Sequence, residues 1–290
     1  MSTVVSENRS PAFLPLALAT LMLALTGAFT LISAISTPAD AYEPISRGVR
    51  TVQWLSSNAA LIGFALVLSS VLVERRGVPP RAWVTIVSAL IVIFALGLAW
   101  SLAQNKLIVS FQGGVSGKAL MVWMALLSAA KVVIVNLIAL PLAWRLGGGR
   151  GDTPVTWRPW QRRVLGALVA ASFCAGVALL VQWVATSFTA LGDGDSNQHV
   201  GMSVVAIGVG LVHGLFALIL PMRRGSGAVP AMVSSLLTPV LIIIASLPAI
   251  AGGEGWDMAG RIAVVMLILL FAPMLSWLVV RWLHGRGGRG

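Results

Sequence analysis

The sequence predicts an all-α protein built as a polytopic bundle of eight transmembrane helices. Hydrophobic residues make up 58% of the chain, charged residues only 10%, and the mean hydropathy is +0.92. A soluble domain carries roughly 25% charged residues, so lipid must be the solvent for most of this chain. The polar segments between the apolar runs are too short to fold as separate soluble domains, so we expect one integrated membrane domain.

The apolar runs give the eight spans in order. Each has about 20 mainly apolar residues, enough to cross roughly 30 Å of hydrocarbon. The first run has few positive charges ahead of it and is long for a signal-peptide core, so we treat it as a retained span. The predicted spans are Ala12–Ala34, Leu55–Val73, Ala82–Leu102, Ala119–Trp144, Val164–Phe188, Gly201–Pro221, Ala228–Ala251 and Ile262–Val280.

The distribution of basic residues predicts the topology. With eight alternating spans, fourteen arginines fall on one side of the membrane, whereas the other side receives five basic residues and most of the acids. The richer side is expected to face the cytoplasm, which places both termini inside. The arginines on that side are Arg9, Arg75, Arg76, Arg81, Arg145, Arg150, Arg158, Arg162, Arg163, Arg223, Arg224, Arg281, Arg286 and Arg289.

Charge and cysteine usage narrow the partners and cofactors. The net charge of +11 is explained by the cytoplasmic arginines, so the lipid bilayer is the expected partner and nucleic acid is not. Cys174 is the single cysteine and lies in an apolar run, which excludes an intrachain disulfide or a thiolate zinc site. No histidine pair is placed for haem, and we expect no cofactor. The compact, Arg-rich style suggests the cytoplasmic (inner) membrane of a bacterium.

The two halves of the chain, residues 1–150 and 151–290, resemble each other. The inner end of the second span, Val71–Gly77, reads like that of the sixth, Ile219–Gly225, and both are followed by Val-Pro and another span. A real repeat would relate two four-helix halves of equal orientation, as in parallel-repeat transporters. The alternative is that any two four-span membrane segments with basic inner loops look alike.

Lys131 is the strongest candidate for a functional residue. It falls near the middle of the fourth span, where a charge costs several kcal/mol unless it is paired, hydrated or neutral. The predicted spans contain no Asp or Glu, so a counter-ion would have to be a bound anion, a lipid headgroup, a partner subunit or a loop. Asn136, on the same helix, is expected either to bind the substrate or to hydrogen-bond across helices. The alternative for Lys131 is an uncharged lysine with a structural role.

His213 and Pro239 complete the set of candidate substrate-binding residues. His213 is predicted to lie centrally in the sixth span between Gly210 and Gly214, where small residues let another helix approach closely. A lone buried histidine is more often structural than a ligand. Pro239 is expected to kink the seventh span and free a backbone carbonyl, which is common both in transport sites and in simple kinks.

One enzymatic alternative involves His213 and a serine in the outer loop. Gly114, Val115, Ser116 and Gly117 open the fourth span, and His213 follows two spans later. In that order, Ser116 and His213 resemble the Ser-His dyad of rhomboid-type intramembrane proteases. The second span lacks the His-x-x-x-Asn element of those enzymes, and a flexible loop explains the glycines equally. We expect no catalytic residues.

Two function classes follow from these residues. The first is a transporter or permease-like module with a site near Lys131 for an anionic or amphipathic solute. The second is a non-catalytic subunit or scaffold that assembles with protein partners through its small-residue helix faces. A transporter should enclose a polar cavity that reaches Lys131, whereas a subunit should expose a large helix face.

Overall fold

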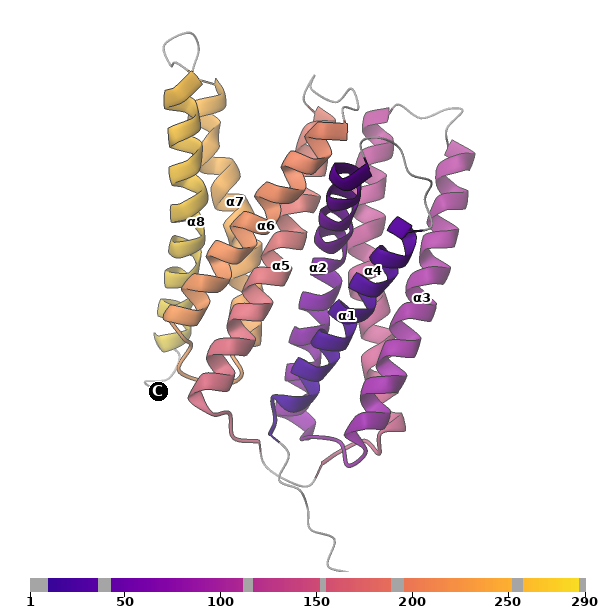
Figure 1. Cartoon of the computed structure of the whole chain (residues 1–290). Helices are drawn as coiled ribbons and strands as arrows, with labels where there is room; N and C mark the ends of the chain where they lie inside the picture. Colours follow the sequence, from indigo (N-terminus) through magenta and orange to yellow (C-terminus); the bar gives the residue numbers. More distant parts are fainter. Residues whose placement is uncertain are drawn as a thin grey trace, which may run out of the picture.

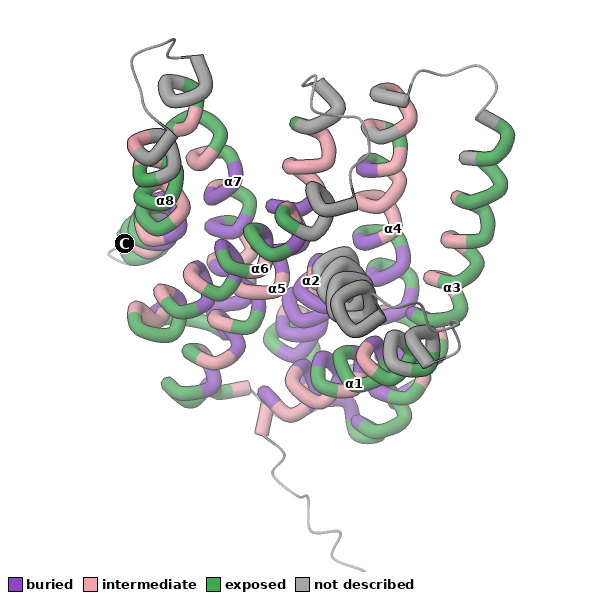
Figure 2. Tube along the Cα trace, turned by 45° about the horizontal axis from the view of Figure 1, so that its top comes forward, coloured by how far each residue is buried: buried purple, intermediate pink, exposed green. Residues whose placement is uncertain are grey.

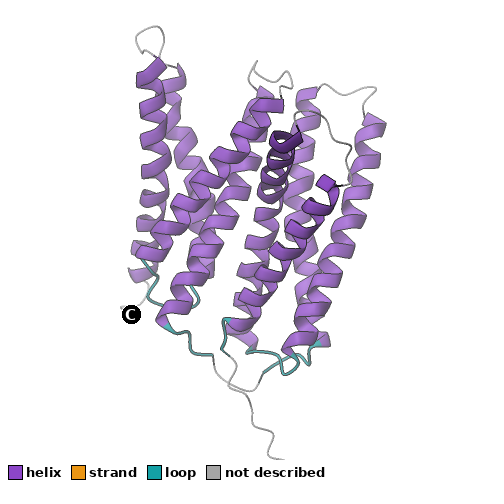
Figure 3. Ribbon diagram, viewed as in Figure 1, coloured by secondary structure: helices purple, strands orange, loops and turns teal. Residues whose placement is uncertain are grey.

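The protein folds as a bundle of long helices (Figure 1). The structure, a computed structural model, describes residues 10–35, 43–111, 117–151, 155–188, 196–251 and 258–286. In these ranges every regular element is a helix, and short loops connect the helices (Figure 3). The eight helices are α1 (Phe13–Ile35), α2 (Glu43–Arg76), α3 (Ala82–Phe111), α4 (Gly117–Leu146), α5 (Pro159–Phe188), α6 (Ser196–Ile219), α7 (Ala228–Ala251) and α8 (Met258–Arg286).

Seven of these helices, α2 to α8, are long and apolar enough to cross a membrane, which is the architecture of a multi-pass membrane protein. The predicted eight helices are confirmed. The first helix has a shorter apolar stretch, Phe13–Phe29, so its crossing stays a prediction. Most helices extend beyond their predicted spans, above all α2, which begins at Glu43, and α3, which continues to Phe111. Apolarity limits a predicted span, whereas helical hydrogen bonding continues into polar sequence.

Helices α2 and α5 form the centre of the bundle. Their membrane-crossing windows are 61% and 56% buried, against 28% for α3 and α8, which lie at the edges (Figure 2). Small residues let the central pair approach closely. A Cβ added to Gly63 would lie 2.8 Å from the backbone nitrogen of Phe173, and one added to Gly176 would lie 2.5 Å from that of Ala60.

The helices of the two halves have matching neighbours. In residues 13–146, α1 contacts α2 and α3, α2 contacts α4, and α3 contacts α4. In residues 159–286, α5 contacts α6 and α7, α6 contacts α8, and α7 contacts α8. Contacts of α2 with α5, α6 and α7, and of α4 with α5, join the halves.

One end of the bundle carries the loops that follow α2, α4 and α6 (Figure 3). Helix α2 ends at Arg76 and is followed by Gly77, whose φ of +73° suits glycine and whose N–H donates to the carbonyl of Val73 at 2.9 Å. We call this end the Arg-rich face. Its described arginines are Arg75, Arg76, Arg81, Arg145, Arg150, Arg158, Arg162, Arg163, Arg223, Arg224 and Arg281.

A carboxylate joins the two halves at the Arg-rich face. Glu74, near the end of α2, accepts a hydrogen bond from the backbone N–H of Ser226 at 2.8 Å and one from its hydroxyl at 3.4 Å. Ser226 precedes α7 in the loop after α6. Arg162 of α5 also donates to the backbone carbonyl of Arg223 in that loop. The loop between α6 and α7 is therefore attached to both central helices.

Candidate functional site

Lys131 lies between α4 and α3. Its ammonium donates to Ser101 Oγ at 3.1 Å, and Ser101 Oγ donates in turn to the carbonyl of Gly97 at 2.9 Å. The lysine stem packs beside Gly97, where an added Cβ would be in ordinary van der Waals contact with Lys131 Cε at 3.7 Å. Lys131 is partly buried and faces an edge helix of the bundle.

The lysine side chain extends toward the outer end of the bundle. Lys131 lies fifteen residues before the end of α4, roughly 22 Å from the Arg-rich face at a rise of 1.5 Å per residue. Ser101 lies nineteen residues into α3, roughly 28 Å from the same face. Long basic side chains snorkel in this way to bring their charge toward the membrane interface. The Lys131 α carbon lies near the middle of α4, and its ammonium contacts α3 at a point further from the Arg-rich face.

Asn136 lies on a different face of α4, where it packs against α2. Its side chain is fully buried, and Nδ2 donates to the carbonyls of Leu61 at 3.2 Å and Val132 at 2.9 Å. Among the hydrogen bonds of the described residues, Oδ1 has no partner. The side chain therefore joins α4 to α2, and it does not share a face with Lys131.

His213 belongs to a buried polar cluster formed by α6, α7 and α8. Its Nε2 lies 2.9 Å from Ser234 Oγ, and its Nδ1 lies 3.4 Å from Thr238 Oγ1. Thr238 Oγ1 is also 2.5 Å from Ser276 Oγ on α8. The Trp277 ring meets the imidazole edge-to-face at a centroid distance of 5.8 Å. All five side chains are at most 1% exposed.

The hydroxyl groups of this cluster donate to backbone carbonyls. Ser234 donates to the carbonyl of Ala231, Thr238 to that of Ser234 at 2.9 Å, and Ser276 to that of Pro273. Nε2–H can then donate to Ser234 Oγ, which accepts as well as donates. His213 therefore acts as a polar link between three helices, the structural role considered for a lone buried histidine.

His213 lies six residues before the end of α6 at Ile219, roughly 9 Å from the Arg-rich end of that helix. It is three residues from the midpoint of the apolar stretch Gly201–Ile219, whereas the helix as a whole begins earlier, at Ser196. The expected close approach is confirmed, because a Cβ added to Gly210 would overlap the carbonyl oxygen of Ala171 on α5.

Pro239 is buried in α7 and follows the cluster residue Thr238. The helix is continuous from Ala228 to Ala251, so the proline does not interrupt it. Because Pro239 has no N–H, it leaves the carbonyl of Ser235 without its helical donor. Of the four predicted residues, only Pro239 and His213 lie near each other, whereas Lys131 and Asn136 pack against two other helices.

The structure does not test the proposed pair of Ser116 and His213, because Ser116 lies outside the described residues. The serine that does contact His213 is Ser234. A serine hydroxyl beside a histidine nitrogen is the contact of a nucleophile with its base. Both side chains are, however, fully buried, so a substrate has no access to Ser234 in this arrangement. Among the described residues, no three His, Cys, Asp or Glu side chains gather to hold a metal.

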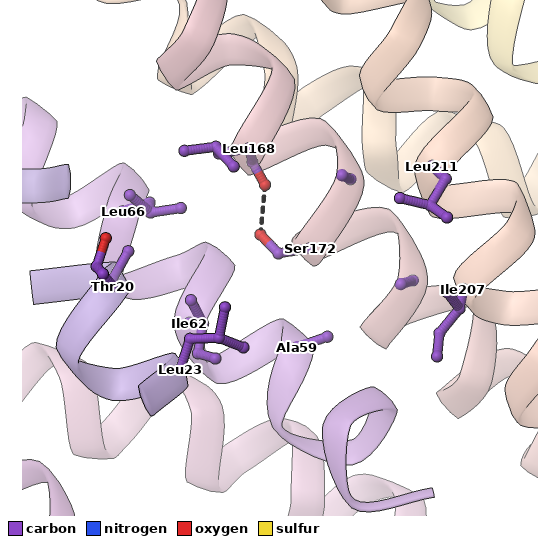
Figure 4. A pocket seen from close by; sticks show the side chains of 12 residues that line it. Thr20, Leu23, Ala59, Ile62, Leu66, Leu168, Ser172, Ile207 and Leu211 are labelled. Atoms are coloured by element: carbon purple, nitrogen blue, oxygen red, sulfur yellow. Dashed lines mark hydrogen bonds between the residues drawn. The ribbon is translucent and has the colours of Figure 1, made fainter. Parts of the chain in front are cut away.

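A cavity that the sequence did not predict lies between the two halves. It has a volume of about 310 Å³, and its walls come from α1, α2, α5 and α6 (Figure 4). Leu23 and Leu211 in its walls are 52% and 63% exposed, so the cavity opens on the side of the bundle. We call it the lateral groove; its walls include Leu23, Ala59, Ile62, Leu168, Ser172 and Leu211.

The lateral groove is apolar. Its hydroxyl groups come from Thr20 and Ser172, and Ser172 Oγ already donates to the carbonyl of Leu168 at 2.6 Å. The volume is at the low end of the roughly 300–1,000 Å³ typical of small-molecule sites. Neither Lys131 nor His213 lines it. A hydrocarbon chain is the kind of group that such a surface accommodates.

The sequence contained some indication of the partners of His213, but none of the lateral groove. Ser234 and Thr238 are four residues apart, a spacing that places two hydroxyls on one face of a helix. The lateral groove gave no such signal, because its residues are ordinary Leu, Ile and Ala drawn from four helices. Comparison of the chain with protein-family models, with curated proteins and with solved structures gives no match in any of the three.

Proposed function

We propose that this protein is a carrier for an amphipathic solute, whose hydrocarbon part occupies the lateral groove. The observation that carries the proposal is the apolar cavity of about 310 Å³ between helices of the two halves. An apolar ligand in the groove would contact α1 and α2 on one side and α5 and α6 on the other. Movement of one half against the other would then change the surroundings of the bound ligand, as in transporters built from repeats.

The matching helix neighbours support a parallel 4+4 repeat. The same four pairs contact each other in residues 13–146 and in residues 159–286, with α1 to α4 taking the places of α5 to α8. Gly77 and Gly225, which are equivalent in the similar sequences Val71–Gly77 and Ile219–Gly225, both have positive φ, at +73° and +60°. These features favour two related halves over two chance arrangements.

The proposed orientation has the Arg-rich face in the cytoplasm of a bacterial cell, with the protein in the inner membrane. Every arginine whose side chain the structure describes belongs to this face, and positive charge is retained on the cytoplasmic side of short loops. Both the start of α1 and the end of α8 are on this side, so both termini are proposed to be cytoplasmic.

Transbilayer movement of a labelled single-chain amphiphile in vesicles tests the proposal. The key variant is Ala59→Phe, which places a ring in the groove where Ala59 points (Figure 4). Its matched control is Ala99→Phe on the exposed face of α3, because both alanines lie seventeen residues from the Arg-rich end of their helices. We expect the wild type and Ala99→Phe to move the probe and Ala59→Phe to lose most of that movement.

Equal movement by Ala59→Phe and wild type would contradict the proposal. No movement by the folded wild type, together with a stoichiometric protein partner in purified samples from the native membrane, would favour the alternative of a membrane subunit. A site at Lys131 stays a prediction, and Lys131→Met in the same assay tests it.

A further inference from the structure

A second cavity lies beside α1 at the Arg-rich face. It has a volume of about 500 Å³, and its walls include Ser10, Phe13, Leu16, Trp83 and Trp160. Thr20 lines both this cavity and the lateral groove. The two cavities therefore follow one another along α1, from the Arg-rich face toward the middle of the bundle. We call the second one the Trp83–Trp160 cavity.

The walls of this cavity have the character of a membrane interface. Trp83 and Trp160 are 52% and 51% exposed, and tryptophan concentrates at the level of lipid headgroups. Phe13 packs edge-to-face against Trp83 at a centroid distance of 5.3 Å, which fixes the start of α1 on α3. Gln161 of α5 donates to Ser10 Oγ, which attaches the segment before α1 to the opposite wall.

The charges around the cavity favour an anion. Arg81 lies two residues before the wall residue Trp83, and Arg163 lies three residues after the wall residue Trp160, a spacing that puts Arg163 beside Trp160 on α5. Both arginines are exposed. Helices α1, α3 and α5 all begin at this cavity, and their N-terminal dipole ends add to the positive potential.

Carboxylates do not offset this charge in the described part of the chain. Glu74 is the one acidic residue whose side chain the structure describes, and it accepts hydrogen bonds from Ser226 in the loop before α7. Arg162, the neighbour of Arg163, differs from it by donating to the carbonyls of Trp157 and Arg223. Arg162 therefore holds the fold together, whereas Arg81 and Arg163 are exposed cations close in sequence to the two tryptophans of the cavity.

We propose that the carrier takes an anionic single-chain phospholipid from the leaflet at the Arg-rich face. The phosphate lies in the Trp83–Trp160 cavity near Arg81 and Arg163, and the acyl chain follows α1 past Thr20 into the lateral groove. This inference rests on the proposed function and adds the charge of the ligand and the side from which it loads. The small volume of the groove fits one chain, and the arginines select against a headgroup without net negative charge.

Native mass spectrometry of the purified protein with defined lipids tests the inference. The probes are lysophosphatidylglycerol, lysophosphatidylcholine of equal chain length, and inorganic phosphate. We expect wild type to prefer the anionic lipid. The double variant Arg81→Gln and Arg163→Gln should weaken its binding by roughly tenfold to thirtyfold, at about one kilocalorie per mole for each basic residue, and leave the zwitterionic lipid unchanged.

The control is the double variant Arg76→Gln and Arg145→Gln, which removes two exposed arginines of the same face from α2 and α4, helices that contribute no wall to the cavity. Equal loss of anionic-lipid binding in both double variants would overturn the inference, because general surface charge would then explain the selectivity. Equal binding of the two lipids by wild type would also overturn it. Binding of inorganic phosphate that depends on Arg81 and Arg163 and excludes neither lipid would identify a plain anion site instead.

The same measurement separates this inference from the proposed function. Ala59→Phe should weaken the binding of both lipids, since the phenylalanine ring occupies the space of the acyl chain. If Ala59→Phe abolishes binding while the Arg81 and Arg163 variant has no effect on headgroup preference, the groove stands and the headgroup site is wrong. If Ala59→Phe has no effect, the proposed function itself is wrong. Elution as a single folded species in detergent serves as the folding control for each variant.

Discussion

The two sides of α5 differ in how they pack. Toward α6 the helix is closed, because Gly210 and Gly214 lie against Ala167, Ala171 and Ala175 with no space for a methyl group. Toward α1 the same helix leaves the lateral groove open. Both sides are apolar, so hydrophobicity does not distinguish them.

The difference shows what holds helices together in lipid. Lipid tails are as apolar as leucine, so close contact of small residues and hydrogen bonds must supply the association. The seam between α5 and α6 has both a small-residue face and the nearby polar cluster of His213. The lateral groove also has small residues in its walls, but there the helices do not meet, and Leu and Ile side chains line the opening between them. A ligand with a hydrocarbon chain can therefore compete there with membrane lipid.

The largest effect on stability is expected when one methyl group is added inside the tight seam between α5 and α6. Gly210→Ala should destabilise the protein by about 3 kcal/mol, because the added Cβ overlaps the backbone oxygen of Ala171 and the helices must separate. Gly208→Ala on the same helix is the control, since nothing lies within 4 Å of its added Cβ. Unfolding in detergent measures both, and equal stabilities would show that the seam is not closely packed.

A smaller effect is expected from the polar cluster that borders the seam. Thr238→Val keeps the shape but removes the hydroxyl that lies near His213 Nδ1 and Ser276 Oγ, which should cost about 1 kcal/mol. A double-mutant cycle with Ser276→Ala measures the coupling between α7 and α8 in the same unfolding assay. Additive effects would mean that the two hydroxyls act independently.

The open side should tolerate a larger residue. Ala59→Phe is expected to change the unfolding free energy by less than about 0.5 kcal/mol, because its ring enters space that is already open to the membrane. The contrast with Gly210→Ala sharpens the comparison, because the much larger added side chain of Ala59→Phe should lower the unfolding free energy far less. A loss of stability near that of Gly210→Ala would mean that the groove is closed in the membrane.

The smallest effect is expected at Lys131. Lys131→Met removes one hydrogen bond to Ser101 from a partly buried side chain, and stability should stay within about 0.5 kcal/mol of wild type. Movement of the amphiphile should also be unchanged, because Lys131 does not line the lateral groove. Loss of movement in a stable Lys131→Met variant would instead support the site predicted from the sequence.

Composition and the length of the apolar runs were enough to predict the fold at the level of its helices. All eight helices form where an apolar run was found, and α7 has the predicted bounds, Ala228–Ala251. The ends of α2 and α3 were less predictable, because helices continue beyond the hydrocarbon. Gly210 and Gly214 were also correctly associated with a close helix contact, since only small residues allow one.

The candidate site was less predictable, for physical reasons. Lys131 attracted attention because a charge in a span is costly, but a long flexible side chain can move its charge by several ångströms toward the interface. His213 was recognised, whereas its partners on α7 and α8 depend on which faces of three helices meet. The lateral groove is a property of spacing between helices, and no single residue type marks it.

The most direct test of the carrier proposal is photo-cross-linking in membranes. A single-chain anionic phospholipid with a photoreactive group near the end of its chain is activated, and the labelled peptides are identified by mass spectrometry. We predict labels on the groove residues of α1, α2, α5 and α6, with unlabelled competitor and Ala59→Phe each removing them. Labels spread over the exposed faces of α3 and α8, and insensitive to both, would contradict the account.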